Sequence, residues 1–177
     1  MLAFTMTLAA VLAAGDPLPT IEGRDLTGAR VQLPAAAKGK VTLLILGFTY
    51  ESRHQVEDWT RRFRQEFERT PQAGFYEIPM IGGAARLGKW FIDSGMRRGT
   101  PREDHARVVT VYSGAGDWKK RVAYKEKDAA YLILLDAAGR VRFLHRGKLE
   151  DGAWRKLASA TRQWLDHFAT EGEKAHK

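Results

Sequence analysis

The apolar positions of this chain repeat with two different periods, which predict alternating β-strands and α-helices. The stretch IEGRDLTGARVQL predicts a β-hairpin, with a strand near Ile21, a turn over residues 26–29 and a return strand over 30–33. The run VTLLILGF over 41–48 is apolar throughout and begins with a β-branched residue, which is typical of a strand buried on both faces. We therefore expect a hairpin followed by a central buried strand.

A long amphipathic helix is expected directly after this central strand. Ser52 and Gln55 have the spacing of a capping box, in which two side chains satisfy the first backbone N–H groups of a helix. Pro71 and Gly74 end the segment. One face of the helix carries the apolar residues that are expected to point inward, which are Val56, Trp59, Phe63 and Phe67.

The second half of the chain continues the alternation. Strands are expected over 75–83, 108–113, 129–136 and 140–146, and helical segments over 87–99, from Thr100, over 116–124 and over 150–168. The last two strands form a second hairpin, whose turn is capped by the side chain of Asp136. This order predicts an α/β fold with a mixed central β-sheet flanked by helices and an N-terminal β-hairpin.

Length and composition fit one globular domain. The chain has 177 residues, of which 44% are hydrophobic and 28% are charged. We assign residues 16–170 to a single domain and residues 171–177, EGEKAHK, to a polar tail.

Residues 1–15 resemble a secretory signal peptide. They carry no charge, are nearly all apolar or small, and end in Ala13, Ala14 and Gly15, although a positive n-region is missing. The run is too short to span a bilayer. We therefore expect export across a bacterial inner membrane to the periplasm, with any later membrane association peripheral; if residues 1–15 are not a signal, the protein is cytoplasmic.

Charge and cysteine content narrow the chemistry. The formal net charge is +8 and the sequence pI is about 9.9, so the surface favours anionic partners. The chain contains no cysteine, which excludes disulfides, cysteine-bound metals and every thiolate nucleophile. The five histidines are scattered without the short spacing of metal ligands, so we expect no metal site and no cofactor.

The order of elements resembles the thioredoxin fold: a buried strand opens into a long helix, and a strand–D-x-x-G–strand hairpin is closed by a C-terminal helix. Thioredoxin chemistry needs a thiolate at the N-terminus of the long helix, where backbone N–H groups lower its pKa. When the chain is aligned on Phe48, other residues stand at the two cysteine positions and at the cis-proline position. The resemblance implies a degenerate thioredoxin site formed by Arg53, His54, Val56 and Ala130.

A narrower resemblance is carried by the stretches LGFTYESRHQVEDW (46–59), GKWFIDSGMRRGTPREDH (88–105) and AYLILLDAAGRVRF (130–143). They are similar to the mitochondrial assembly factor for the membrane sector of ATP synthase and to its bacterial relatives. The middle stretch is the most specific of the three. The resemblance implies a non-catalytic chaperone for a membrane protein complex such as ATP synthase, with a subunit of that complex as its protein partner.

Partner-binding residues are expected mainly in the middle stretch. Arg97 and Arg98 precede a predicted helix start, where guanidinium groups and free backbone N–H groups can bind a carboxylate or phosphate. A solvated pair of surface arginines is the alternative interpretation. The full set of candidates is Trp90, Arg97, Arg98, Thr100, His105 and Arg142.

Arg142 belongs to a predicted basic stripe. Arg140, Arg142 and Arg146 alternate along one strand, so all three are expected on one face, beside Lys148. Few aromatic residues interleave with them, which disfavours nucleic acid as a partner.

Two other functions stay open on the sequence. The fold could serve a non-thiol enzyme that uses His54 or His105 as a base, which requires a pocket that pairs the histidine with a carboxylate and a nucleophile. The positive charge could instead serve binding to anionic lipid or nucleic acid, and such binding would depend on salt.

Overall fold

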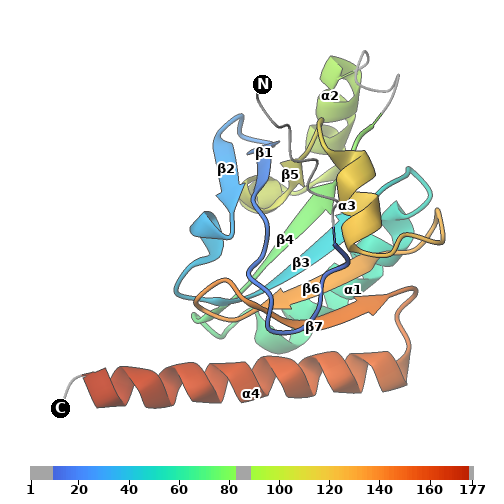
Figure 1. Ribbon diagram of the computed structural model, residues 1–177. Helices are drawn as coiled ribbons and strands as arrows, with labels where there is room; N and C mark the ends of the chain where they lie inside the picture. The colour runs from blue at the N-terminus through green and yellow to red at the C-terminus, as the bar shows by residue number, and fades with distance from the viewer. Residues whose placement is uncertain (1–9, 83–88, 176–177) are drawn as a thin grey trace, which may run out of the picture.

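A strand buried on both faces lies at the centre of the computed structural model, which describes residues 10–82 and 89–175 (Figure 1). This strand, β3 (Val41–Gly47), consists of seven residues that are all buried. Both of its long edges are paired, so its backbone groups are satisfied within the sheet. The predicted central strand is confirmed.

The central sheet has the order β4-β3-β6-β7. β3 runs parallel to β4 (Ala73–Pro79) and antiparallel to β6 (Tyr131–Leu135), and β6 forms a hairpin with β7 (Val141–Arg146). The expected mixed sheet and second hairpin are confirmed. Asp136 holds the hairpin turn as predicted, because its Oδ1 accepts hydrogen bonds from the backbone N–H groups of Ala138 and Arg140.

Two helices cover one face of the sheet. α1 (Arg53–Phe67) and α4 (Asp151–Ala175) pack against the side chains of β3 that point to this side. All four apolar residues predicted to point inward from α1 are buried. α4 begins close to the predicted position but continues through residue 175, so it includes most of the stretch expected to be a polar tail.

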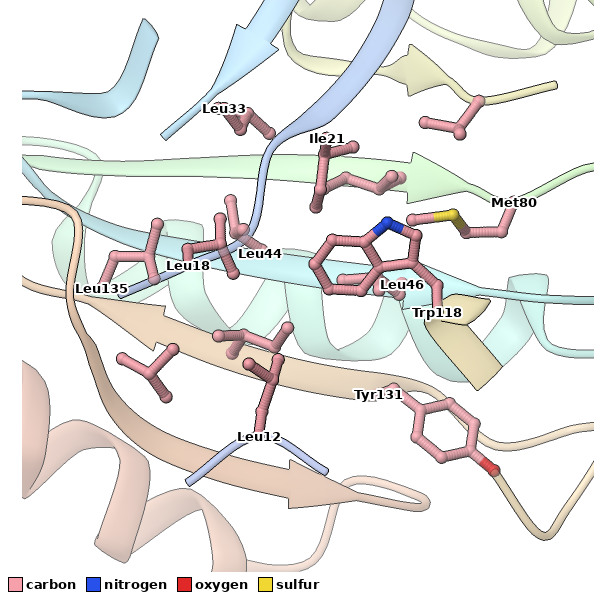
Figure 2. Packing of buried hydrophobic residues seen from close by; sticks show 14 of the residues in the cluster. Leu12, Leu18, Ile21, Leu33, Leu44, Leu46, Met80, Trp118, Tyr131 and Leu135 are labelled. Atoms are coloured by element: carbon pink, nitrogen blue, oxygen red, sulfur yellow. The ribbon is translucent and has the colours of Figure 1, made fainter. Parts of the chain in front are cut away.

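The opposite face is covered by α3 (Ala115–Arg121) and by the N-terminal part of the chain. Figure 2 shows Trp118 of α3 beside Leu44 and Leu46 of β3, with Leu12 and Leu18 in the same cluster. Within the described residues, no helix is both long and apolar enough to cross a bilayer.

The predicted N-terminal hairpin is confirmed and belongs to a second sheet of order β2-β1-β5. β1 (Ile21–Asp25) pairs with β2 (Arg30–Leu33) on one side and with the short β5 (Val109–Thr110) on the other. A short 3₁₀ helix, η1 (Ala35–Ala37), leads from β2 to β3. Residues on both sides of β5 form isolated bridges to β4 and its end, Glu77 with Val108 and Met80 with Val111, so the two sheets are joined.

Two predicted helix caps are wrong. Ser52 has helical backbone angles, and its Oγ donates to the carbonyl oxygen of Thr49 at 2.8 Å instead of accepting from the helix. Gln55 does not reach back to Ser52 either, because its Oε1 accepts from the backbone N–H of Ala130. Thr100 starts no α-helix; it follows α2 (Lys89–Gly99) and precedes a 3₁₀ helix, η3 (Arg102–Arg107), which Pro101 precedes directly.

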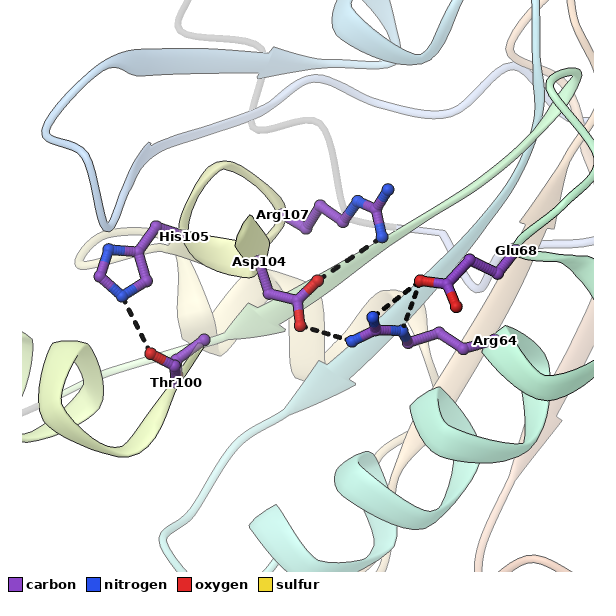
Figure 3. A network of polar contacts seen from close by, with 6 residues as sticks. All are labelled: Arg64, Glu68, Thr100, Asp104, His105 and Arg107. Atoms are coloured by element: carbon purple, nitrogen blue, oxygen red, sulfur yellow. Dashed lines mark hydrogen bonds and ion pairs between the residues drawn. The ribbon is translucent and has the colours of Figure 1, made fainter. Parts of the chain in front are cut away.

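An ion-pair network attaches η3 to α1 (Figure 3). The buried carboxylate of Asp104 lies 2.5 Å from Nη1 of Arg64 and 3.5 Å from Nη1 of Arg107. Arg64 also binds Glu68 one turn along α1, at 2.7 Å. Since η3 follows α2 directly, this network fixes the end of the α2 segment against the body of the domain.

Replacing the buried member of this network should destabilise the fold. We expect Asp104→Asn to lower the free energy of unfolding by about 2 kcal/mol, because Arg64 and Arg107 then face a neutral amide in a largely buried place. The matched control is Asp58→Asn, whose carboxylate pairs with Arg61 on the surface and whose loss should cost at most about 0.5 kcal/mol. Urea unfolding at pH 7 measures both, and equal losses for the two variants would contradict the account.

Burial raises the pKa of Glu77 on β4 above its ordinary value. The hydroxyl of Thr60 lowers this pKa, whereas the neighbouring carboxylates of Glu57 and Asp104 raise it. A raised pKa in the folded state means that the folded chain holds this proton more tightly than the unfolded chain. Stability therefore falls as the pH rises from the ordinary glutamate pKa through the folded value.

Glu77→Gln should remove this pH dependence, because the amide has nearly the same shape but cannot ionise. At pH 8 we expect the variant to melt about 2 °C above the wild type, and at pH 4 the two melting temperatures should converge. Glu103→Gln, at an exposed position of η3, serves as the control and should follow the wild type at both pH values. A Glu77→Gln difference that is the same at pH 4 and pH 8 would exclude Glu77 as the cause.

Candidate functional site

The loop from β3 to α1 holds the predicted degenerate thioredoxin site. Gly47 ends β3 at a point where the first turn of α1 approaches the strand closely. A Cβ atom at Gly47 would lie 2.7 Å from Oγ of Ser52 and 3.3 Å from Cγ2 of Val56, so only glycine fits without a shift. The chain therefore keeps the close strand-to-helix junction that brings a helix N-terminus to the edge of the sheet.

Arg53 and Val56 occupy the first turn of α1 with different surroundings. The guanidinium carbon of Arg53 lies 3.8 Å from the centre of the Tyr50 ring, and its Nη1 donates to the carbonyl oxygen of Tyr50 at 3.3 Å. Val56 is buried in the core, while His54 between them is exposed. Arg53 and His54 thus border the solvent, and Val56 has become part of the packing.

Ala130 lies beside the same helix turn. It is fully buried, and its backbone N–H donates to Oε1 of Gln55 at 3.3 Å. The structure therefore brings Ala130 together with the start of α1, and a side-chain amide of α1 binds the backbone at this place.

The hydroxyl groups of this loop are used to hold the loop itself. Ser52 is buried and donates to Thr49, and Oγ1 of Thr49 donates to the carbonyl oxygen of Lys127 on the segment that precedes β6. Both hydroxyl groups thus donate to backbone carbonyl oxygens. This arrangement is suited to a rigid surface rather than to nucleophilic chemistry.

Sequence reasoning missed one residue of this surface. Tyr50 has 76% of its surface exposed, although the ring is large and partly apolar. Its stacking with Arg53 holds both side chains in place before any partner arrives, and tyrosine and arginine are enriched where proteins bind one another. The spacing of Tyr50 and Arg53 across a loop carries no signal in the sequence, because only the turn geometry brings the two together.

The candidates of the middle stretch are partly structural. Nε of Arg97 donates to the carbonyl oxygen of Leu26 at 2.8 Å, and the backbone N–H of Leu26 donates to the carbonyl oxygen of His105 at 3.0 Å. A ring nitrogen of His105 lies 3.0 Å from the carbonyl oxygen of Thr100 (Figure 3). The structure thus brings Arg97, Thr100 and His105 together around the turn of the N-terminal hairpin, where they fix α2.

Two candidates of this stretch are not held in this way. Arg98 is exposed, and no hydrogen bond or ion pair to another described residue involves it. The side chain of Trp90 lies outside the described residues. Arg98 is therefore the candidate with a charge available to a partner.

The anion site expected beside a helix N-terminus remains a prediction. Arg97 and Arg98 lie in the last turn of α2, near backbone carbonyl groups, which stabilise cations. The helix that follows them is the short 3₁₀ helix η3, which Pro101 precedes. The arginines consequently match the polarity of the helix end at which they lie, and of the two only Arg98 has no hydrogen bond to another described residue.

The basic stripe expected on β7 is also wrong, because a β-bulge interrupts the alternation. Leu134 pairs with Phe143, but Leu135 pairs with Val141, which leaves Arg142 as the extra residue. The bulge turns Arg142 toward α4, apart from the arginines on either side of it.

The contacts of Arg142 differ from those of Arg140 and Arg146. The guanidinium carbon of Arg142 lies 3.8 Å from the ring centre of Trp164 on α4, and its Nε donates to Oδ2 of Asp136 at 2.7 Å. Arg140 and Arg146 instead donate to backbone carbonyls of the N-terminal segment and of the loop after α3. Arg142 therefore stabilises the hairpin against α4 and lies away from the other partner-binding candidates.

The requirements for a histidine-based enzyme are not met at the predicted residues. His54 is exposed, and His105 contacts a backbone carbonyl. Two hollows in the described part of the chain are lined by other residues. Among residues 10–82 and 89–175, no group of three or more side chains is arranged to hold a metal ion.

Comparison with known proteins agrees with this geometry. A putative thiol:disulfide interchange protein DsbE from Chlorobium tepidum superposes with a TM-score of 0.57 and 18% identity, over 85% of this chain and 99% of that chain. A putative protein disulfide isomerase from Bacteroides thetaiotaomicron superposes with a TM-score of 0.56 and 19% identity, over 97% of this chain and 99% of that chain. A thiol peroxidase from Chromobacterium violaceum superposes with a TM-score of 0.53 and 17% identity, over 86% of this chain and 89% of that chain. These similarities establish the thioredoxin-like fold.

The sequence comparisons identify the family. No curated protein matches the chain. The sequence model of one family, described as ATP10 protein, matches residues 16–163, which is most of the chain. This chain therefore belongs to the ATP10 protein family, a thioredoxin-like family of ATP synthase assembly factors.

Proposed function

We propose that this protein is a non-catalytic assembly factor that binds a subunit of a membrane complex such as ATP synthase. One observation carries the proposal: the strand-to-helix junction of a thioredoxin-like site is intact, yet its hydroxyls donate to backbone carbonyls and the chain contains no cysteine. A scaffold retained without its reactive group is suited to binding. Membership of the ATP10 protein family supports the same role.

The outer surface of α2 is the proposed contact with the protein partner. Arg97 fixes the helix to the N-terminal hairpin, and Arg98 on the next position is exposed. In Figure 1 α2 projects from the end of the molecule opposite α4. A charged side chain on a fixed, projecting helix can bind a carboxylate of a partner with little loss of entropy.

The proposed place of action is the membrane surface on the exported side. The apolar residues 1–15 support export to the periplasm, and the net charge of +8 supports peripheral contact with an anionic membrane. Binding to the membrane would then be electrostatic and would weaken with salt.

Affinity capture of the full chain from the cells that naturally produce it tests this proposal. We expect the wild type to enrich ATP synthase subunits over a control, and Arg98→Glu to enrich them about ten-fold less, because the reversed charge repels the partner carboxylate. Arg155→Glu is the matched control, since Arg155 is an exposed arginine on α4, at the other end of the molecule, and should behave like the wild type.

The capture experiment tests the proposed function and the proposed contact on α2 separately. If the wild type never enriches ATP synthase subunits or those of another membrane complex, the proposed function is wrong. If Arg98→Glu captures as much as the wild type, the function stands but the contact on α2 is wrong. Melting temperatures of both variants should stay within about 2 °C of the wild type, because both positions are exposed.

A further inference from the structure

Residues 10–18, which we name the N-terminal strap, follow the free edge of the central sheet. The backbone N–H of Gly15 donates to the carbonyl oxygen of Val141 at 2.7 Å, and the N–H of Val141 donates to the carbonyl oxygen of Asp16 at 2.9 Å. Pro17 forms an antiparallel bridge with Arg140. Over residues 15–17 the strap is therefore a short additional strand beside the start of β7, visible as the dark-blue segment near β7 in Figure 1.

Toward its N-terminal end the strap leaves β7 and crosses to α3. Its turn is held by the side chain of Asp16, whose Oδ2 accepts from the N–H of Ala13 at 2.8 Å. The N–H of Leu12 donates to the carbonyl oxygen of Arg121 at 2.9 Å. The Leu12 side chain is 8% exposed and joins the hydrophobic cluster shown in Figure 2, whereas the adjacent Val11 is 61% exposed.

Beside Leu12 lies an open groove of about 360 Å³, between the end of α3 and the C-terminal end of β7, and Val11 and Leu12 form part of its lining. Its lining includes the apolar side chains of Val122 and Leu144 and the ring of Tyr131, with Arg121 and Arg146 beside them. Neither arginine forms an ion pair with another described residue.

We propose that this groove is a docking site for an extended apolar segment of a partner protein with a carboxylate near it, and that the strap occupies the site in its absence. This inference rests on the proposed function, since an assembly factor must hold apolar surface of an unassembled subunit away from water. The strap itself indicates the occupant: an extended segment supplies one apolar side chain, a backbone hydrogen bond to α3 and strand pairing with β7.

The strap also explains how the site is kept closed. A segment of the same chain is present at a high effective concentration, so it competes with any partner segment for the groove. The strap has two buried leucines, Leu12 and Leu18, and a few backbone hydrogen bonds. Only Leu12 lines the groove, which makes displacement of this end of the strap possible. The strap can close the groove only in a chain that retains residues 10–15, because removal of residues 1–15 as a signal peptide would remove Leu12 and leave the groove open.

The test uses the full chain and a peptide of its own sequence, AVLAAGD (residues 10–16), titrated into the protein while the NMR methyl signals of Val122 and Leu144 are followed. In the wild type the strap competes, so we expect weak binding. In Leu12→Ala the strap holds the groove less firmly, and the dissociation constant of the peptide should fall about ten-fold. Leu18→Ala is the matched control, because Leu18 is a buried strap leucine that does not line the groove.

Leu12→Val provides a second variant should Leu12→Ala fail to fold, with an intermediate gain in affinity. A peptide with serine in place of its leucine should move neither methyl signal. The proposal is overturned if the methyl signals of Val122 and Leu144 do not shift, or if Leu12→Ala and Leu18→Ala bind the peptide equally. Either result leaves the capture of a membrane complex untouched, so this failure is distinguishable from a failure of the proposed function.

Discussion

The complete burial of β3 is the constraint on which the rest of the structure depends. A strand whose two faces are both apolar needs cover on both sides, and burying its backbone requires a paired strand on each edge. α1 and α4 supply one cover, and α3 with the N-terminal segment supplies the other. The loop from β3 to α1 follows from the first cover, and the groove beside α3 follows from the second.

The first cover positions the former redox loop. Because α1 must begin where β3 ends, Gly47, Ser52 and Val56 come into close contact, whatever chemistry the loop performs. In this chain the contact is stabilised by hydroxyl and amide hydrogen bonds and by packing, and the side chains of Tyr50, Glu51 and His54 are exposed. The scaffold is thus independent of the thiols that other thioredoxin-like proteins place on it.

Sequence periodicity was sufficient for the elements and their order, because burial repeats every two or 3.6 residues in a strand or helix. The central strand, the inward face of α1 and both hairpins were predictable for this reason. The network around Asp104 was not, since Arg64 lies 40 residues away along the chain and only the return of η3 to α1 brings them together. Long-range polar pairs leave no periodic signal.

The wrong predictions about the candidate site also have local structural causes. The bulge that turns Arg142 toward α4 shifts the register by one residue, and such a shift reverses the face of a side chain. Thr100 and Ser52 have the composition of helix caps, but the adjacent turns use their polar groups differently. Several residues of the stretch 88–105 fix α2 in place, and Arg98 is an exposed charge of this stretch without a hydrogen bond or ion pair to another described residue.

The central claim is that this thioredoxin-like protein acts in the assembly of a membrane complex and not as a catalyst. The most direct measurement is the amount of assembled ATP synthase, by native gel and by membrane ATP hydrolysis, in cells that naturally produce the chain, with and without its gene. Loss of the gene should lower the assembled complex while unassembled subunits persist, and the wild-type chain should restore it. An unchanged amount of assembled complex in cells that lack the gene would contradict the claim.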